Sequence, residues 1–229
     1  MRMRRKKHGD TRREALSALM IEPEALKSGC ARDFFENSNA PLHLEIGCGK
    51  GDFAIGMAKR HPEINFIAME RVADVILCAM EKCAGIEPGD PNVPTADVLP
   101  KNIRFLLGNA NELTSFFGEG EIDALYLNFS DPWPKAGHEK RRLTYVSFLK
   151  QYQTVLVPNG SLTMKTDNRA LFDYSLESFA ANGWKMADIT YDLHNSIWNE
   201  GNIETEYERN FSQKGFSINR VVATAPRTK

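Results

Sequence analysis

The sequence has few of the features that mark membrane, secreted or metal-dependent proteins. No apolar run approaches the ~18 residues that span a bilayer, and no apolar stretch follows the basic first residues, as a secretory signal would require. The cysteines have no C-x-x-C spacing and no histidine pairs near them, which disfavours a disulfide framework, a zinc site and metal catalysis; they are Cys30, Cys48, Cys78 and Cys83. We therefore expect a cytoplasmic protein with reduced thiols, no metal and no membrane segment.

The net charge is also small, but the charges are unevenly placed. With 29 Lys and Arg against 30 Asp and Glu, the formal net charge is −1. Basic residues crowd positions 1–13, and a second basic cluster lies at 135–142. Two such clusters on a near-neutral chain favour contact with a nucleic acid, although a solvated tail would also explain the first. Nothing in the sequence separates a monomer from a homodimer.

Strands and helices alternate regularly from residue 42 onward. Apolar runs predict strands at 42–46, 64–69, 103–107, 122–129 and 161–165, with helical patterns at 52–60, 73–84, 110–117, 142–155 and 168–181. Two last strands are expected at 185–191 and 216–224, joined by a long polar segment without a clear helix. The alternation predicts an α/β fold: a single Rossmann-like domain with a mostly parallel seven-stranded sheet, helices on both faces and an antiparallel edge strand. We assign 1–13 to a basic disordered arm, 14–40 to a helical or irregular extension and 41–229 to this domain.

A glycine-rich turn follows the first strand of this pattern. Gly47, Gly49 and Gly51 alternate with other residues, which allows a tight turn and a close approach of the backbone to a ligand. In dinucleotide-binding loops the third glycine falls one position later, where this chain has Asp52. Asp52 and Glu45 would repel a pyrophosphate but favour a cationic ligand such as S-adenosylmethionine. A merely tight strand–helix turn is the alternative.

Two polar residues follow the next two strands. Glu70 lies nineteen residues after Gly51, the spacing at which a carboxylate accepts hydrogen bonds from ribose hydroxyls. Asn109 follows the third strand, where an adenine edge would lie, although it would serve equally well as a helix N-cap. Because ligands bind at the carboxyl ends of strands in such sheets, the combination strengthens the prediction of a nucleoside cofactor.

The segment Asn-Phe-Ser-Asp-Pro-Trp-Pro-Lys at 128–135 follows the fourth strand. Pro132 and Pro134 fix their own φ angles and favour an extended conformation in the residues before them. Asp131 and Trp133 are therefore expected in a stiff segment at the mouth of the sheet, where one carboxylate could face a flat ligand. A proline-rich turn whose tryptophan only packs is the alternative.

The motifs Glu-Ile-Gly-Cys-Gly-Lys-Gly, Asn-Phe-Ser-Asp-Pro-Trp-Pro-Lys and Thr-Glu-Tyr-Glu together resemble those of bacterial tRNA (guanine-N7-)-methyltransferases, over roughly residues 40 to 225. The resemblance implies a class I methyltransferase fold that uses S-adenosylmethionine to methylate a guanine in the tRNA variable loop. By this resemblance the cofactor site contains Glu45, Glu70, Asn109 and Asp131, besides the glycines. The substrate site contains Lys135, Asp167, Thr205, Glu206, Tyr207 and Glu208. The RNA-contacting segment is Gly137, His138, Glu139, Lys140, Arg141 and Arg142. Two features depart from the expected pattern: a long loop at 85–101, and Arg71 where an apolar residue is expected.

The chemistry of N7 gives Asp131 a specific role. Guanine N7 has a free lone pair and no proton, so no general base is needed. Methylation makes the ring cationic, and Asp131, accepting from N1 or the exocyclic amine, would stabilise that charge. Asp167 is a candidate second acceptor, or else an N-cap. Lys135 and Arg141 are expected to bind phosphates.

Several alternatives stay open at this point. Thr205 and Glu208 have the spacing of a capping box, so they could mark only a helix start, and Arg141 and Arg142 could be a solvated helix start. A methyltransferase acting on an exocyclic amine is disfavoured because Trp133 separates the two prolines. The intact acids disfavour a non-catalytic RNA-binding module, and Asp52 disfavours a nicotinamide dehydrogenase.

Overall fold

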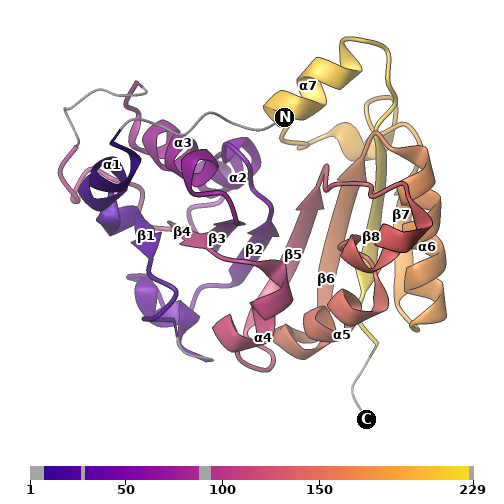
Figure 1. Ribbon diagram of the computed structural model, residues 1–229, viewed down its shortest axis with the longest axis horizontal. Helices are drawn as coiled ribbons and strands as arrows, with labels where there is room; N and C mark the ends of the chain where they lie inside the picture. Colours follow the sequence, from indigo (N-terminus) through magenta and orange to yellow (C-terminus); the bar gives the residue numbers. More distant parts are fainter. Residues whose placement is uncertain (1–7, 27–28, 88–93, 227–229) are drawn as a thin grey trace.

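The computed structural model describes residues 8–26, 29–87 and 94–226. In this part of the chain, eight strands form one sheet with helices on both faces (Figure 1). The strand order is β1-β4-β3-β2-β5-β6-β8-β7. The strands are β1 (Met20–Ile21), β2 (Leu42–Ile46), β3 (Asn65–Glu70), β4 (Ile103–Leu107), β5 (Ile122–Asn128), β6 (Leu156–Thr166), β7 (Lys185–Thr190) and β8 (Asn219–Thr224). The predicted α/β class is confirmed, with one more strand than expected because β1 pairs with β4.

The sheet is parallel except around β8. This strand runs antiparallel to both β6 and β7, and it lies between them rather than at the edge of the sheet. From β2 the chain moves outward through β3 and β4, then returns to pair β5 with the other side of β2. The strand order therefore reverses between β2 and β5. Ligands bind outside the carboxyl ends of the strands at such a reversal.

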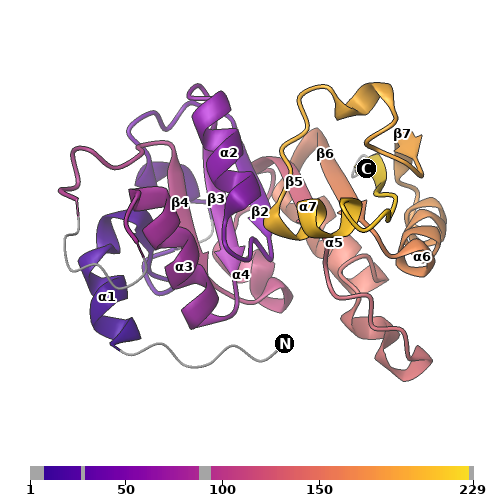
Figure 2. The same ribbon diagram turned by 90° about the horizontal axis from the view of Figure 1, so that it is seen from above.

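Apolar side chains on both faces of the strands pack against helices. Phe66 and Ala68 of β3 pack with the first set of helices, whereas Ile67 and Met69 face the second. The first set comprises α2 (Asp52–Arg60) and α3 (Ala73–Ala84), and α1 (Gly9–Ala15) contacts α3; the second set comprises α4 (Leu113–Phe116), α5 (Val146–Val155) and α6 (Arg169–Ala181). Figure 2 shows the same arrangement from above. Within the described ranges, none of the helices combines the length and apolar character needed for a membrane crossing.

The predicted bounds of α2 and α3 are confirmed at every residue. Gly51 occupies the N-cap of α2 with φ 80°, and Gly85 ends α3 with φ 70°. Both conformations are left-handed, which glycine adopts without steric cost. A Cβ on Gly51 would lie 2.9 Å from Ala79 Cβ, so this glycine also permits the close packing of α2 on α3.

The N-terminal prediction requires a correction. Residues 1–7 of the expected arm lie outside the described residues, but Gly9–Ala15 form α1 rather than a disordered arm. The guanidinium of Arg12, on this helix, pairs with the buried carboxylate of Glu81 on α3. This ion pair fixes α1 to the body of the protein. A 3₁₀ turn at Ser17–Leu19 then leads into β1, within the extension that was expected to be helical or irregular.

Other boundaries also differ from the predictions, among them the start of the last strand, which is Asn219 rather than 216. Helix α5 begins at Val146 rather than 142, because Arg142 is extended and Ala136–Arg141 form a separate 3₁₀ helix, η4. Strand β6 begins at Leu156 rather than at 161. The polar segment before β8 contains a 3₁₀ turn (Ile197–Asn199) and a helix, α7 (Glu206–Ser212), where no clear helix was expected.

Candidate active site

The glycine turn lies between the ends of β2 and α2. Gly47, Gly49 and Gly51 all have positive φ, at 75°, 56° and 80°. The amide of Gly47 donates to Met69 O on the neighbouring strand at 2.8 Å, which anchors the turn to the sheet. The turn therefore takes the tight conformation that its sequence predicts.

Glu45, at the end of β2, is buried beneath this turn. Its Oε1 accepts a hydrogen bond from Asn128 Nδ2 at 2.8 Å, and its Oε2 accepts from Ala54 N at 3.1 Å. Burial raises its pKa to about 7, against the opposing effects of Asn128 and of the Lys165 charge. Glu45 thus braces α2 and β5 while holding a carboxylate close to the turn.

Glu70, at the end of β3, lies against the other side of the turn. Its Oε2 accepts from Gly49 N at 3.2 Å. Its Oε1 accepts from Arg71 N at 2.9 Å and Val72 N at 3.0 Å. The carboxylate is therefore adjacent to the glycine turn, as the nineteen-residue spacing predicts.

A cavity of about 460 Å³ opens at the ends of β2, β3, β4 and β5. Four of the predicted cofactor residues line it: Gly47, Glu70, Asn109 and Asp131. Its rim includes Trp133, Lys140 and Arg141. Asn109 also caps a 3₁₀ turn (Ala110–Glu112), because its Oδ1 accepts from Asn111 N at 3.1 Å, which confirms the alternative of an N-cap.

The backbone of the Asp131 segment departs from the prediction at Trp133, which precedes Pro134 but is not extended. Phe129 and Trp133 both have positive φ, at 55° and 42°, which is uncommon for bulky residues. Asp131 between them is exposed, and its Oδ2 lies 3.7 Å from Arg71 Nη2. The cation of Arg141 stacks on the Trp133 ring at 4.8 Å, and Arg142 Nη2 donates to Trp133 O at 3.2 Å.

A second cavity, of about 360 Å³, lies on the far side of the glycine turn. It is lined by the turn, by the end of β5 and by the start of α7, through residues that include Glu45, Gly47, Gly49, Phe129, Thr205, Glu206 and Tyr207. Thr205 Oγ1 accepts from Glu208 N at 3.0 Å, so it is the N-cap of α7. Glu206 N donates to Asp52 Oδ2 at 2.9 Å, which fixes α7 over the glycine turn.

Tyr207 brings the α7 segment to the Asp131 segment. Its ring lies 5.0 Å from the ring of Phe129. Its hydroxyl donates to Asp167, and burial followed by the Asp167 charge raises the Tyr207 pKa. Burial also raises the pKa of Asp167. Phe129 lines both cavities, so this aromatic pair stands where they meet.

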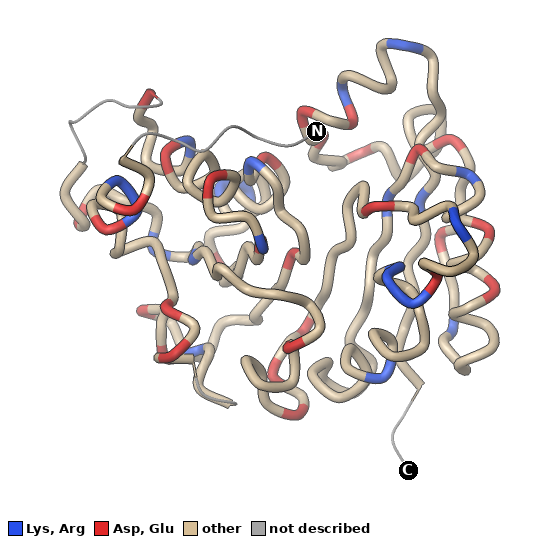
Figure 3. The backbone as a smooth tube through the Cα atoms, viewed as in Figure 1, with Lys and Arg blue, Asp and Glu red and all other residues tan. Residues whose placement is uncertain are grey.

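Other predicted residues line neither cavity. Lys135 and Gly137 are exposed, and the η4 segment that contains Gly137 projects beside α5 and α6 in Figure 2 and includes a blue, basic stretch in Figure 3. His138 and Glu139 are partly buried, with the ring of His138 edge-on to Trp133 at 5.6 Å. Glu208 is fully buried under α7. Across the described ranges, no group of three or more His, Cys, Asp or Glu has the arrangement of a metal site.

Residues 39–221 match a family model described as a putative methyltransferase. A tRNA (guanine-N(7)-)-methyltransferase from Oceanobacillus iheyensis is 45% identical over 97% of this chain and 98% of its own length. One from Lachnoclostridium phytofermentans is 46% identical over 88% of both chains. This chain belongs to the tRNA (guanine-N7-)-methyltransferase family.

Solved structures agree with the fold of this tRNA (guanine-N7-)-methyltransferase family member. The 16S rRNA methyltransferase KamB superposes with a TM-score of 0.58 at 15% identity, covering 99% of this chain and 97% of that one. A mutant 16S rRNA (adenine(1408)-N(1))-methyltransferase from Catenulisporales acidiphilia, with cosubstrate, gives 0.54 at 15% identity, covering 98% and 95%. At these identities the likeness shows a shared Rossmann-like fold.

Two features of this family member were not singled out from its sequence. Lys165 is a charged residue inside a predicted strand and gave no functional signal, yet its Nζ lies 2.7 Å from the Glu208 carboxylate. Arg71 was noted only as a departure from the family pattern, and the structure places it beside Asp131. The partners of both come from distant parts of the chain, so no local spacing could identify them. The described ends of the 85–101 loop contain no helix or strand, and residues 88–93 lie outside the described residues.

Proposed function

We propose that this enzyme transfers a methyl group from S-adenosylmethionine to N7 of a guanine in the tRNA variable loop, forming 7-methylguanosine. The observation that carries the proposal is the position of Asp131. It follows the strand at which the sheet order reverses, on the wall of a cavity that also contains Glu70, Asn109 and Gly47. The names of relatives that share 45–46% of their sequence with this chain support the same reaction.

The residues around the glycine turn fit this cofactor. Glu70 offers carboxylate oxygens for ribose hydroxyls, and Asn109 offers an amide near the end of β4. Glu45 and Asp131 provide negative charge near the turn, which suits a cation and would oppose a pyrophosphate. When bound, S-adenosylmethionine supplies an electrophilic methyl group on a sulfonium.

Asp131 is proposed to bind the guanine and to stabilise its developing charge. Its carboxylate is exposed, and the nearby Arg71 Nη2 is 3.7 Å away, a distance typical of a weak surface pair of about 0–1 kcal/mol. A guanine that donates from N1 and its exocyclic amine can replace that pair at little cost. As N7 is methylated the ring becomes cationic, so the carboxylate interacts more strongly with the transition state than with the ground state.

The α7 segment is proposed to form the opposite wall of the guanine site. Tyr207 presents a partly exposed ring beside Phe129, and flipped bases commonly stack on such rings. Asp167 holds the Tyr207 hydroxyl and offers a second acceptor for the base. Thr205 and Glu206 line the cavity beneath them.

The basic segment from Lys135 to Arg142 is proposed to bind the tRNA backbone. Lys140 and Arg141 are exposed at the rim of the larger cavity, so they can contact phosphates while the guanine enters. The arm at residues 1–7 adds five basic residues to the chain and is proposed as a further phosphate contact. An enzyme acting on tRNA would work in the cytoplasm.

The test is methylation of unmodified tRNA by the purified protein with labelled S-adenosylmethionine. We expect label in 7-methylguanosine, identified after digestion, and strand scission at the labelled position under mild reductive conditions. A labelled product that resists scission would instead indicate an exocyclic amine. Asp131→Asn should lower the methylation rate at least ~100-fold. The control Asp173→Asn changes a carboxylate on α6 that lines neither cavity, and it should behave as wild type.

A further inference from the structure

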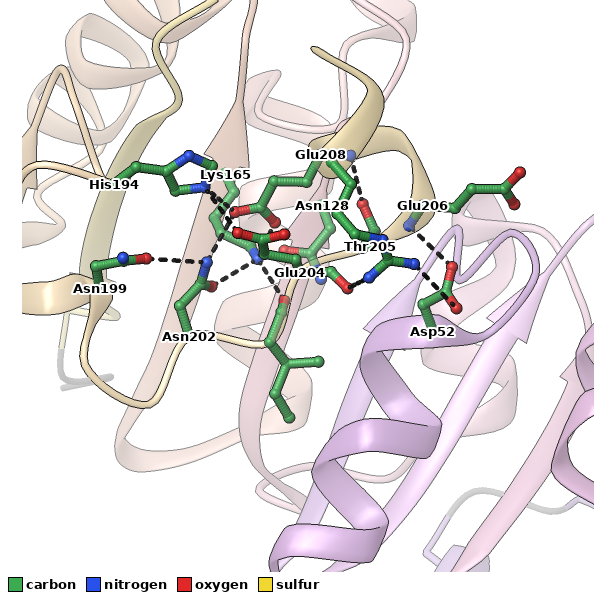
Figure 4. Close-up of polar contacts among 12 residues, drawn as sticks. Asp52, Asn128, Lys165, His194, Asn199, Asn202, Glu204, Thr205, Glu206 and Glu208 are labelled. Carbon is green, nitrogen blue, oxygen red and sulfur yellow. Dashed lines mark hydrogen bonds and ion pairs between the residues drawn. The ribbon is translucent and has the colours of Figure 1, made fainter. Parts of the chain in front are cut away.

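Lys165 has a buried ammonium group with three partners. It lies in β6, and its side chain is 3% exposed. Its Nζ donates to Asn202 Oδ1 at 3.0 Å, to Ile203 O at 3.0 Å and to Glu208 Oε2 at 2.7 Å (Figure 4). An ammonium has three hydrogens, so all of its donors are used inside the protein.

Glu208 is equally enclosed, with 0% of its side chain exposed. Besides Lys165, its Oε1 accepts from Asn202 Nδ2 at 2.8 Å and faces His194 Nε2 at 3.0 Å. Burial opposes the charged form, but Lys165 and these hydrogen bonds outweigh it and keep the Glu208 pKa below its usual value. Its carboxylate points toward Lys165 on β6 (Figure 4), and Glu208 lines neither cavity.

The backbone of Lys165 is tied to the Asp131 segment. Its carbonyl accepts from Phe129 N at 2.8 Å, and Phe129 is the residue with positive φ that begins the turn toward Asp131. One residue therefore contacts both walls of the proposed guanine site. Its backbone fixes the Asp131 wall, and its side chain fixes α7.

The neighbour of Glu208 on α7 is Tyr207. While Glu208 points down to Lys165, the Tyr207 ring lies 5.0 Å from Phe129 and its hydroxyl reaches Asp167, two residues after Lys165. Adjacent residues on a helix turn point in different directions, so anchoring Glu208 sets the position of Tyr207. Breaking a buried pair leaves an uncompensated charge, so α7 has little freedom to leave this position.

We propose that Lys165 and Glu208 are positioning residues: their buried ion pair holds Tyr207 over the Asp131 segment, and Glu208 does not itself contact the guanine. The inference rests on the proposed methylation of guanine N7. It gives Glu208, the buried residue of the Thr-Glu-Tyr-Glu motif, a role that depends on its contact with Lys165 of β6.

The test compares Lys165→Met, Glu208→Gln and the double variant Lys165→Met/Glu208→Leu in the full chain. The double variant replaces the pair with apolar side chains, a change that often preserves folding. The matched control is Lys101→Met, which removes an exposed lysine whose partner, Glu36, is 3.3 Å away and lies outside the site. Single-turnover methylation gives the rate, and calorimetry gives the affinities for S-adenosylhomocysteine and tRNA.

We expect the methylation rate to fall about 10- to 100-fold in all three variants, because small misplacements of a bound reactant have effects of this size. Affinity for tRNA should stay within about threefold, since phosphate contacts dominate it. Affinity for S-adenosylhomocysteine should also be retained, and Lys101→Met should match wild type. If one single variant fails to fold, the other and the double variant carry the test.

A tRNA with inosine at the target position separates positioning from contact. Inosine lacks the exocyclic amine, so the guanosine-to-inosine rate ratio reports groups that bind that amine. We expect the ratio to be the same in wild type and all three variants. A ratio that collapses in Glu208→Gln but not in Lys165→Met would overturn the inference and make Glu208 a direct contact. Wild-type rates in folded variants would also overturn it, whereas an inactive wild type would refute the proposed function instead.

Discussion

Glu45 makes a quantitative prediction about pH, because it is a buried acid that titrates near neutrality. It is 3% exposed, and burial raises its pKa to about 7 from an ordinary value near 4.5. The folded protein therefore binds more protons than the unfolded chain between these two values. The stability that protonated Glu45 contributes is complete below pH ~4.5 and is lost as the pH rises through ~7. A difference of this size corresponds to about 3 kcal/mol.

The perturbation is Glu45→Gln, which is neutral at every pH and close in shape. Urea unfolding should be measured for both proteins between pH 5 and pH 8. We expect the stability of the variant relative to wild type to increase with pH, by up to about 3 kcal/mol over this range. Taking the difference between the two proteins cancels the other titrating groups. A difference that does not change with pH would show that Glu45 titrates outside this window.

Binding of the cofactor should also release the proton from the Glu45 carboxyl group. A cationic ligand near Glu45 favours the carboxylate, so binding at pH 7 should release about half a proton from this group. Calorimetry of S-adenosylmethionine binding in two buffers with different ionisation enthalpies measures that release. The cofactor's own amine also titrates. The decisive quantity is therefore the number of protons released by wild type minus the number released by Glu45→Gln. Equal proton counts in both proteins would remove Glu45 from the cofactor's surroundings.

Three further substitutions test the proposed site. Asp131→Asn should lower the single-turnover rate at least ~100-fold, because it removes the charge that stabilises the transition state. Its affinity for S-adenosylhomocysteine in calorimetry should stay within about threefold of wild type, because the cofactor site remains. A wild-type rate would refute this role. Glu70→Ala should weaken cofactor binding about 10- to 100-fold, from ~1.5–3 kcal/mol for hydrogen bonds to a charged group, and an unchanged affinity would separate Glu70 from the ribose. Arg141→Met should weaken tRNA binding. It should also make the slope of the log of the binding constant against the log of the salt concentration shallower by about one. An unchanged slope would mean that Arg141 only packs on Trp133.

Local signals explain which parts of the fold could be predicted. Gly51 precedes α2 and Gly85 follows α3, and both adopt left-handed conformations. Because glycine is the residue that favours such conformations at helix ends, these two positions can be recognised in the sequence. The central strands are apolar runs buried on both faces, which is typical of a parallel sheet. The start of α7 had a local signal in the spacing of Thr205 and Glu208, and the structure confirms Thr205 as its cap.

Features that depend on distant partners could not be predicted. Strand β1 is only two residues long and exists because it pairs with β4, about 85 residues away. Helix α1 is held by Arg12, whose partner Glu81 is 69 residues away. Lys165 and Glu208 are separated by 43 residues, and neither sits in a pattern that indicates burial. A lysine in a strand normally indicates a solvent-facing position, so only the three-dimensional contacts reveal its role.

The charge balance around the guanine site explains why Lys165 is paired. Methylation of N7 creates positive charge on the base, and Lys165 Nζ lies 6.0 Å from the centroid of the Phe129 ring that lines both cavities. An unpaired ammonium at this depth would oppose the reaction, whereas the pair with Glu208 is neutral as a unit. Glu208→Gln removes that compensation as well as the anchor, but the double apolar variant removes only the anchor. The methylation rate should therefore fall further in Glu208→Gln than in the double variant, and the reverse order would show that the charge of Lys165 does not reach the base.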